Sequence, residues 1–187
     1  MASRAINQNV VFSDPPFAAK LFGDTRWSIV WLIMRLYVGY EWLTAGLEKL
    51  QSPAWTQTGL ALKGFWTNAI VVNDAAHPTI AFGWYRAFLS GLLNSGSYVW
   101  FSKLIVAGEL LIGIALILGI FTGIAAFFGG FMNWNFMMAG SASTNPLLFV
   151  ISIILILAWK TAGYIGLDRW ILPLLGTPWQ PGRAIKK

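Results

Sequence analysis

The chain has 187 residues, of which 57% are hydrophobic and 11% are charged, and its mean hydropathy is +0.63. So many apolar and so few charged residues exclude an ordinary soluble domain. They predict a single-domain, all-α integral membrane protein whose partner is the lipid membrane and not nucleic acid. The sequence has no cysteine and one histidine, His77, which excludes iron–sulfur ligation, cysteine-mediated haem attachment and haem held by two histidines of one chain. No flavin motif is present either.

The first membrane-spanning helix is predicted at residues 27–47. The polar residues 1–26 before it lack the apolar core of a secretory signal, so they are expected to form a cytoplasmic segment. The predicted helix has about the 20 residues that cross a bilayer. It contains Arg35 and Glu41, and a charged side chain at the centre of such a helix costs about 2.5–3.5 kcal/mol. Both residues are therefore expected to face the interior of a bundle and to have partners on other helices.

The stretch 50–97 is broken by glycine, proline and asparagine into pieces too short to span a membrane. Two pieces, about 53–72 and 79–93, have apolar residues three or four positions apart together with three tryptophans and Tyr85. This pattern is typical of helices that lie in the membrane interface. We expect this excursion to lie on the periplasmic side and to cap one mouth of the bundle.

Three further spans after the excursion complete a predicted four-transmembrane-helix bundle. Short connections between them make neighbouring helices antiparallel, and Gly39 and Gly46 would let a neighbour approach the first helix closely. Lys and Arg are more frequent in the two tails than in the excursion, so the positive-inside rule places both termini in the cytoplasm. The three spans and the cytoplasmic tail are predicted, in order, at residues 98–121, 123–138, 146–165 and 166–187.

The charged and amide residues of these helices are predicted to form one polar layer. Counted at 1.5 Å per residue from the cytoplasmic face, Arg35 lies about 12 Å deep, Glu41 about 21 Å, Glu109 about 18 Å, and Asn133 and Asn135 about 16–20 Å. We expect Glu109 to neutralise Arg35. Two interpretations stay open: the layer fixes the packing register of the helices, or it forms a pocket for a quinone head group or a proton relay. In the second, Arg35, Glu41 and Glu109 are the candidate catalytic residues, and Asn133 and Asn135 bind the quinone.

Five segments of the chain resemble the DoxX family of small prokaryotic membrane proteins. The first reads Arg35-Leu36-x-x-Gly39, continues with Leu43, Gly46 and Lys49, and resembles the opening signature of that family. The other four are similar to the DoxD branch, the membrane subunit of thiosulfate:quinone oxidoreductase, and lie at 84–89, 108–119, 133–140 and 163–173. The resemblance covers about residues 25–173.

The resemblance implies an activity, an electron acceptor and a partner. Two thiosulfates would be joined to tetrathionate, and the two electrons released would pass to quinone, which acts as a diffusible acceptor. A second, DoxA-like part would be needed, and few residues follow the fourth predicted helix, so either a separate chain supplies this part or the protein is not that enzyme. The resemblance also implies the inner membrane of a prokaryote. The thiosulfate site would face outwards, and the residues whose charge suits an anion there are Arg86, Lys49 and Lys103.

Two other functions are open. The protein is alternatively a non-catalytic accessory subunit that packs against a larger respiratory or photosynthetic complex. A small transporter is less favoured, because the sequence shows no internal repeat of the kind that builds many transporters.

Overall fold

The computed structural model describes residues 14–72, 78–177 and 180–184, and within them the chain is helical apart from one pair of two-residue strands. The predicted all-α class is therefore confirmed. His77 and the basic tail residues Arg4, Lys186 and Lys187 lie outside the described residues. The elements are α1 (Pro16–Gly23), the 3-10 turn η1 (Thr25–Trp27), α2 (Ser28–Leu50), α3 (Pro53–Thr56), α4 (Leu60–Ile70), α5 (Gly83–Asn94), α6 (Tyr98–Leu118), α7 (Thr122–Met138), α8 (Asn145–Leu157), α9 (Trp159–Ala162), α10 (Asp168–Leu175), β1 (Gly176–Thr177) and β2 (Gln180–Pro181).

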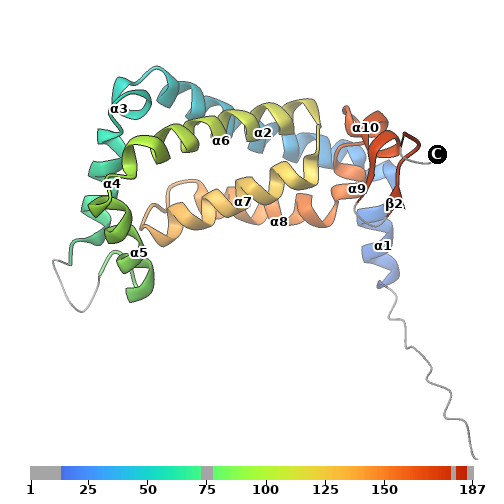
Figure 1. Ribbon diagram of the computed structural model, residues 1–187. Coiled ribbons are helices and arrows are strands. Elements are labelled where there is room, and N and C mark those ends of the chain that lie inside the picture. Colours follow the sequence, from blue (N-terminus) through green and yellow to red (C-terminus); the bar gives the residue numbers. More distant parts are fainter. Residues whose placement is uncertain (1–13, 73–77, 178–179, 185–187) are drawn as a thin grey trace, which may run out of the picture.

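Four long helices form the bundle, as two closely packed antiparallel pairs: α2 with α6, and α7 with α8 (Figure 1). Glycine makes the first pair close. A Cβ atom on Gly39 would meet Ile117, and one on Gly46 would meet Leu110, each at about van der Waals contact or closer. Gly113 of α6 similarly lies against the backbone of Leu43. The predicted close approach at Gly39 and Gly46 is thus confirmed, and it fixes the register of α2 on α6.

The predicted bounds of the first three spans agree with α2, α6 and α7 to within three residues, but the fourth span at 146–165 is wrong as one continuous helix. Helix α8 has 13 residues and ends at Leu157, and the short α9 follows it. At this break the hydroxyl of Thr161 donates to the carbonyl of Ala158 and to that of Phe22 in α1, at 3.3 and 3.0 Å. The chain leaves its helical path here because it packs against the N-terminal helix, a contact that hydropathy does not encode.

The excursion folds over one end of the bundle, as predicted. Helices α3, α4 and α5 lie there in Figure 1, and α3 and α4 pack on α6. A second hydrophobic core fills this end; its fully buried members include Leu62, Ile80 and Leu89. Gly59, with φ +69°, sits directly on the carbonyl of Tyr98, where a side chain would not fit. These contacts hold helices α3, α4 and α5, which together form the cap of the bundle, to the start of α6.

The opposite end of the bundle gathers α1, α9, α10 and the strand pair, so the first and last described elements lie at the same end (Figure 1). The strands pair antiparallel, with Gly176 opposite Pro181. Among the described residues, α6 is the one helix with both the length and the mean hydropathy, 2.1 over its best window, to cross a membrane; α8 is apolar but shorter.

Candidate functional site

Arg35 lies at the end of the bundle that holds α9 and α10, and its surroundings differ from the prediction. The side chain is 1% exposed, and Nη2 donates to the carbonyl oxygen of Ile165 at 2.7 Å. Nη1 lies against Gly119 and Gly166, and a Cβ atom on either glycine would overlap it. The predicted pairing of Arg35 with Glu109 is therefore wrong. Instead, Arg35 ties the end of α6 to the segment that follows α9.

Asp168 completes this joint and was not predicted from the sequence. Its carboxylate is buried and accepts hydrogen bonds from the backbone N–H of Phe121, at 2.6 Å, and of Thr122, at 2.9 Å. These are the first amides of α7, so Asp168 caps that helix from a distant part of the chain and complements its dipole. Phe121 has φ +46°, an uncommon conformation for a bulky residue, and the cap holds it there. The charge of Arg35 also interacts with Asp168.

Glu109 has a different partner, Lys49. The carboxylate oxygen Oε1 accepts from Lys49 Nζ at 2.9 Å, and the two side chains are 1% and 21% exposed respectively. Lys49 Nζ also lies 5.3 Å from the ring centre of Trp55 in the cap. The pair therefore runs from the rim of the bundle, under the cap, into its interior.

Helix register explains why the predicted depths failed. Gly46 faces Leu110, and Arg35 lies level with Gly119 just after α6. Helix α2 begins seven residues before Arg35, at Ser28, so it extends about 10 Å past the end of α6 at 1.5 Å per residue. Counting each helix from its own end therefore placed Arg35 too near Glu109 and Lys49 too far from it.

Asn133 lies in the bundle interior and belongs to a layer of buried polar atoms. Neither its amide nitrogen nor its amide oxygen has a hydrogen-bond partner among the described residues, and the same is true of Glu109 Oε2, Trp42 Nε1 and Ser152 Oγ. These side chains come from α2, α6, α7 and α8. Gly129 lies against Trp42 and Gly130 against Ser152, one turn from Asn133 on the same face of α7. The predicted polar layer therefore exists, with a different membership.

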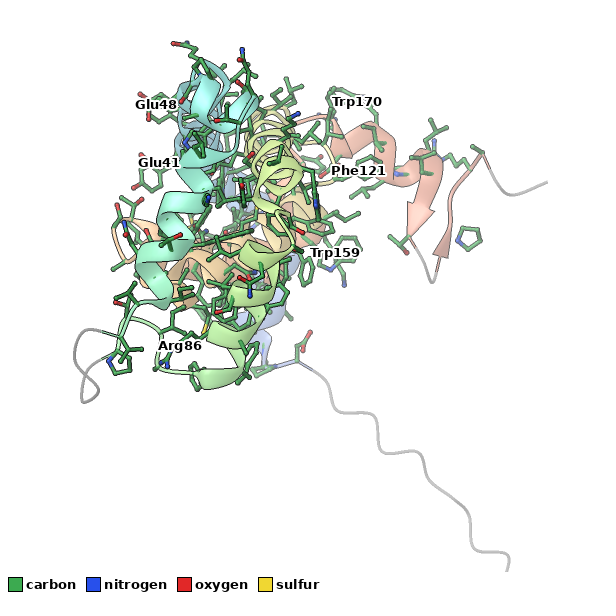
Figure 2. All side chains as sticks on the ribbon, turned by 60° about the vertical axis from the view of Figure 1, so that its left-hand side comes forward. Glu41, Glu48, Arg86, Phe121, Trp159 and Trp170 are labelled. Carbon is green, nitrogen blue, oxygen red and sulfur yellow. The ribbon has the colours of Figure 1, made fainter. Side chains whose placement is uncertain are left out.

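Glu41 and the three predicted anion-binding residues lie in separate surroundings. Glu41 is half-buried and has no hydrogen bond or ion pair within the described ranges, so the predicted partner on another helix is wrong for this residue. Figure 2 shows Glu41 and Glu48 on one side of the bundle and Arg86 on the opposite side. Arg86 Nη2 donates to the carbonyl oxygen of Ile80 at 2.8 Å and so ties α5 to the preceding loop. Lys103 is exposed on α6, whereas Lys49 is engaged with Glu109.

A groove of about 640 Å³ lies between α6 and α7. Its walls are apolar along almost their whole length, from Ile120 and Phe121 at one end to Phe88 and Leu89 of the cap at the other. The groove exists because α6 and α7 are sequential neighbours that pack mainly on other helices, α2 and α8. Small residues, including Gly108, Ala115 and Ala125, keep it open.

Hydrogen-bonding side chains gather at the capped end of the groove. The Tyr85 hydroxyl lies 3.0 Å from the backbone oxygen of Asn135 and 3.2 Å from its Oδ1, so it donates to this residue. The Asn135 amide nitrogen donates to the Phe131 carbonyl at 2.8 Å, which fixes the orientation of the amide. Burial raises the pKa of Tyr85 above its usual value, so the hydroxyl keeps its proton. Asn135 was predicted as a quinone ligand and lines the groove, whereas Tyr85 was missed, although it stands in the 84–89 segment of the resemblance.

Comparison of the chain with protein-family models, with curated proteins and with solved structures gives no match. The resemblance to the DoxX family therefore stays a prediction from the five sequence segments. Three of those segments meet at one place in the fold: Arg35 from the first, Gly119 from the third and Asp168 from the fifth form the joint at the end of α6.

Proposed function

We propose that this protein is a membrane-embedded subunit in quinone-linked oxidoreduction and that the groove between α6 and α7 binds the quinone. The observation that carries the proposal is an elongated apolar groove with its hydrogen-bonding side chains, Tyr85 and Asn135, at one end. Its volume is within the range of about 300–1,000 Å³ typical of small-molecule sites. An isoprenoid quinone has the same distribution of polarity, because a polar ring carries a long apolar tail.

The exposed surfaces of the four long helices support a membrane location. Large apolar side chains are exposed on every one of them, far more than a water-soluble surface of this size tolerates as continuous patches. Examples are Ile33 on α2, Leu111 on α6, Phe128 on α7 and Val150 on α8, each more than half exposed. The deepest charges, by contrast, each have a partner inside the protein, since Arg35 Nη2 donates to a carbonyl and Glu109 Oε1 pairs with Lys49. The four-span topology with the cap outside and both ends in the cytoplasm belongs to this proposal.

The groove can serve the chemistry as follows. A quinone ring at the capped end would accept a hydrogen bond at a carbonyl oxygen from the second N–H of the Asn135 amide, or from the Tyr85 hydroxyl in exchange for its bond to Asn135. Reduction to quinol takes two electrons and two protons. The protons would come from water at the capped end, because burial raises the pKa of Tyr85 and leaves it a hydrogen-bond donor rather than an acid. The donor implied by the resemblance is thiosulfate: two thiosulfates joined by an S–S bond give tetrathionate and two electrons. That step would use the DoxA-like partner, with Lys103, Arg86 and Lys49 as the cations near the capped end.

A second candidate function has one observation in its favour. The groove is open along its side, where Leu104, Leu111, Ile124 and Phe128 are exposed. A transmembrane helix of a larger respiratory or photosynthetic complex would bury the same surface, and the protein would then be an accessory subunit without chemistry of its own.

The proposal is tested by filling the groove. Ala115→Phe places a ring in the groove wall of α6, whereas Ile114→Phe, one residue earlier, adds a ring to the exposed face outside it and is the matched control. Each protein is purified from native membranes in a mild detergent, and quinone is extracted and quantified per mole of protein. We expect about one quinone per chain in the wild type and in Ile114→Phe, and at least a tenfold loss in Ala115→Phe. Equal quinone content in the two variants refutes the quinone site. Loss of a large co-purifying complex in Ala115→Phe alone would favour the accessory function.

A further inference from the structure

The end of the bundle opposite the cap presents basic and aromatic side chains together. Lys20, Arg26, Lys160 and Arg169 are exposed on α1, η1, α9 and α10, which gather at this end (Figure 1). Arg169 lies 5.2 Å from the ring centre of Tyr164 and 6.0 Å from that of Trp170, and Lys160 lies 5.9 Å from the ring of Trp159. Of the described acids at this end, Asp24 lies 4.0 Å from Arg26 and offsets its charge, whereas Asp168 is buried against the first turn of α7 and does not neutralise Lys20, Lys160 or Arg169.

Helix α10 has the form of a helix that lies along a membrane surface. Leu167, Trp170 and Leu174 follow one another at three and four residues, so they share one face, and all three are exposed. Trp170 is 64% exposed, and Figure 2 shows it projecting on the same side of the bundle as Trp159. Tryptophan and tyrosine favour the level of the lipid head groups, where an apolar ring and a polar N–H or O–H are both accommodated.

A cavity lies beside this surface, between α9 and the strand pair. It has a volume of about 440 Å³ and is lined by Lys160, Leu172, Pro173, Thr177 and backbone of two glycines. The Thr177 hydroxyl is buried and has no hydrogen-bond partner within the described part of the chain. A buried hydroxyl without a partner is unfavourable, and a bound acceptor would supply the missing hydrogen bond. The cavity therefore combines a cation, a hydroxyl donor and an apolar wall.

We propose that this end face binds anionic phospholipid, with a head-group phosphate seated between Lys160 and Thr177 and the acyl chains lying on the apolar face of α10. The inference rests on the proposed membrane location. Lipid is the occupant rather than a free anion because the apolar side chains that frame the cations are exposed and need a hydrophobic partner. Arg169 adds a second charge at head-group level.

The test compares lipids on the purified full chain. The protein is reconstituted in nanodiscs of phosphatidylcholine with 20% phosphatidylglycerol, released into the gas phase, and its bound lipids are counted by native mass spectrometry. Each basic residue near an anionic surface contributes a factor of about five in binding. We therefore expect the double variant Lys160→Gln/Arg169→Gln to lower phosphatidylglycerol retention at least tenfold, and Thr177→Val to lower it several-fold without loss of folded protein.

The matched control is Lys63→Gln, because Lys63 is also exposed and lies 5.3 Å from the ring of Tyr98, but in the cap. It should retain phosphatidylglycerol like the wild type. Equal retention of phosphatidylglycerol and phosphatidylcholine by the wild type overturns the proposal, as does an equal loss in Lys63→Gln. Displacement of the lipid by inorganic phosphate alone would make the cavity a free-anion site and would also overturn it. A protein that fails to enter nanodiscs refutes the membrane location itself, whereas normal entry and quinone content with no lipid preference refutes only this inference.

Discussion

Removing Lys49 should damage the protein far more than its position at the rim suggests. The change is Lys49→Met, which keeps the length of the side chain and removes the charge. Glu109 is 1% exposed, and its one ion pair among the described residues is with Lys49, at 2.9 Å. The second carboxylate oxygen, Oε2, has no partner in the same part of the chain. Breaking a buried pair by removing one member costs about 3–5 kcal/mol, because the other charge is left in a medium of low polarity.

The reverse change should be milder. In Glu109→Leu the remaining Lys49 is 21% exposed, and its flexible stem can carry the ammonium group to water, so we expect a loss of about 1–2 kcal/mol. The double variant Lys49→Met/Glu109→Leu replaces the pair by two apolar side chains and should lie within about 1 kcal/mol of the wild type. From the most to the least stable, the expected order is therefore the double variant, Glu109→Leu and Lys49→Met.

The assay is equilibrium unfolding in mixed detergent micelles, followed by tryptophan fluorescence, for all four members of this cycle. A second cycle with Arg35→Leu and Glu109→Leu should be additive within about 0.5 kcal/mol, because these residues do not touch. The reasoning is refuted if Lys49→Met costs less than Glu109→Leu, or if the Arg35 cycle shows the larger coupling energy.

Three further changes test other parts of the structure. Gly119→Ala should cost about 2–4 kcal/mol, because its φ is +68° and a Cβ atom would overlap the Arg35 guanidinium, whereas Gly91→Ala, on an open face of α5, should be neutral or stabilising in the same unfolding assay. Asp168→Asn should lower the free energy of unfolding by about 1–2 kcal/mol through a weaker cap on α7; an unchanged value would contradict the capping role. Tyr85→Phe should abolish an alkaline loss of stability. Because burial raises the pKa of Tyr85 in the folded protein, the contribution of the neutral phenol to stability is present below about pH 10 and is lost as the pH rises through the folded pKa. Parallel pH profiles of stability for the wild type and the variant would contradict the burial of this hydroxyl.

The helical elements could be predicted from the sequence because they depend on local properties. Apolar runs of suitable length predicted α2, α6 and α7, and the small residues Gly39 and Gly46 predicted that another helix packs closely on α2, which is α6. The capping excursion followed from its breakers and aromatic spacing. These features are encoded within a few turns of each element.

The partners of the charged residues could not be predicted, because they depend on how far one helix is shifted along another. The shift of α2 past the end of α6 brings Lys49 to Glu109 and Arg35 to the carbonyl of Ile165. The cap of α7 by Asp168 joins positions 46 and 47 residues apart, which no local pattern shows. The groove arises in the same way, since it is a property of the pairing of α6 with α2 and of α7 with α8, and Tyr85 reaches it from the cap.

The central claim, a quinone in the groove between α6 and α7, is tested most directly by photoaffinity labelling. The wild-type protein in nanodiscs is irradiated with a quinone that carries an azide on its ring, with and without an excess of unmodified quinone, and the labelled peptides are identified by mass spectrometry. The account predicts label at the capped end, on the α5 peptide with Tyr85 and the α7 peptide with Asn135, and its disappearance with competitor. Label on the outer faces of α2 and α8, or label that the competitor does not reduce, would contradict the account.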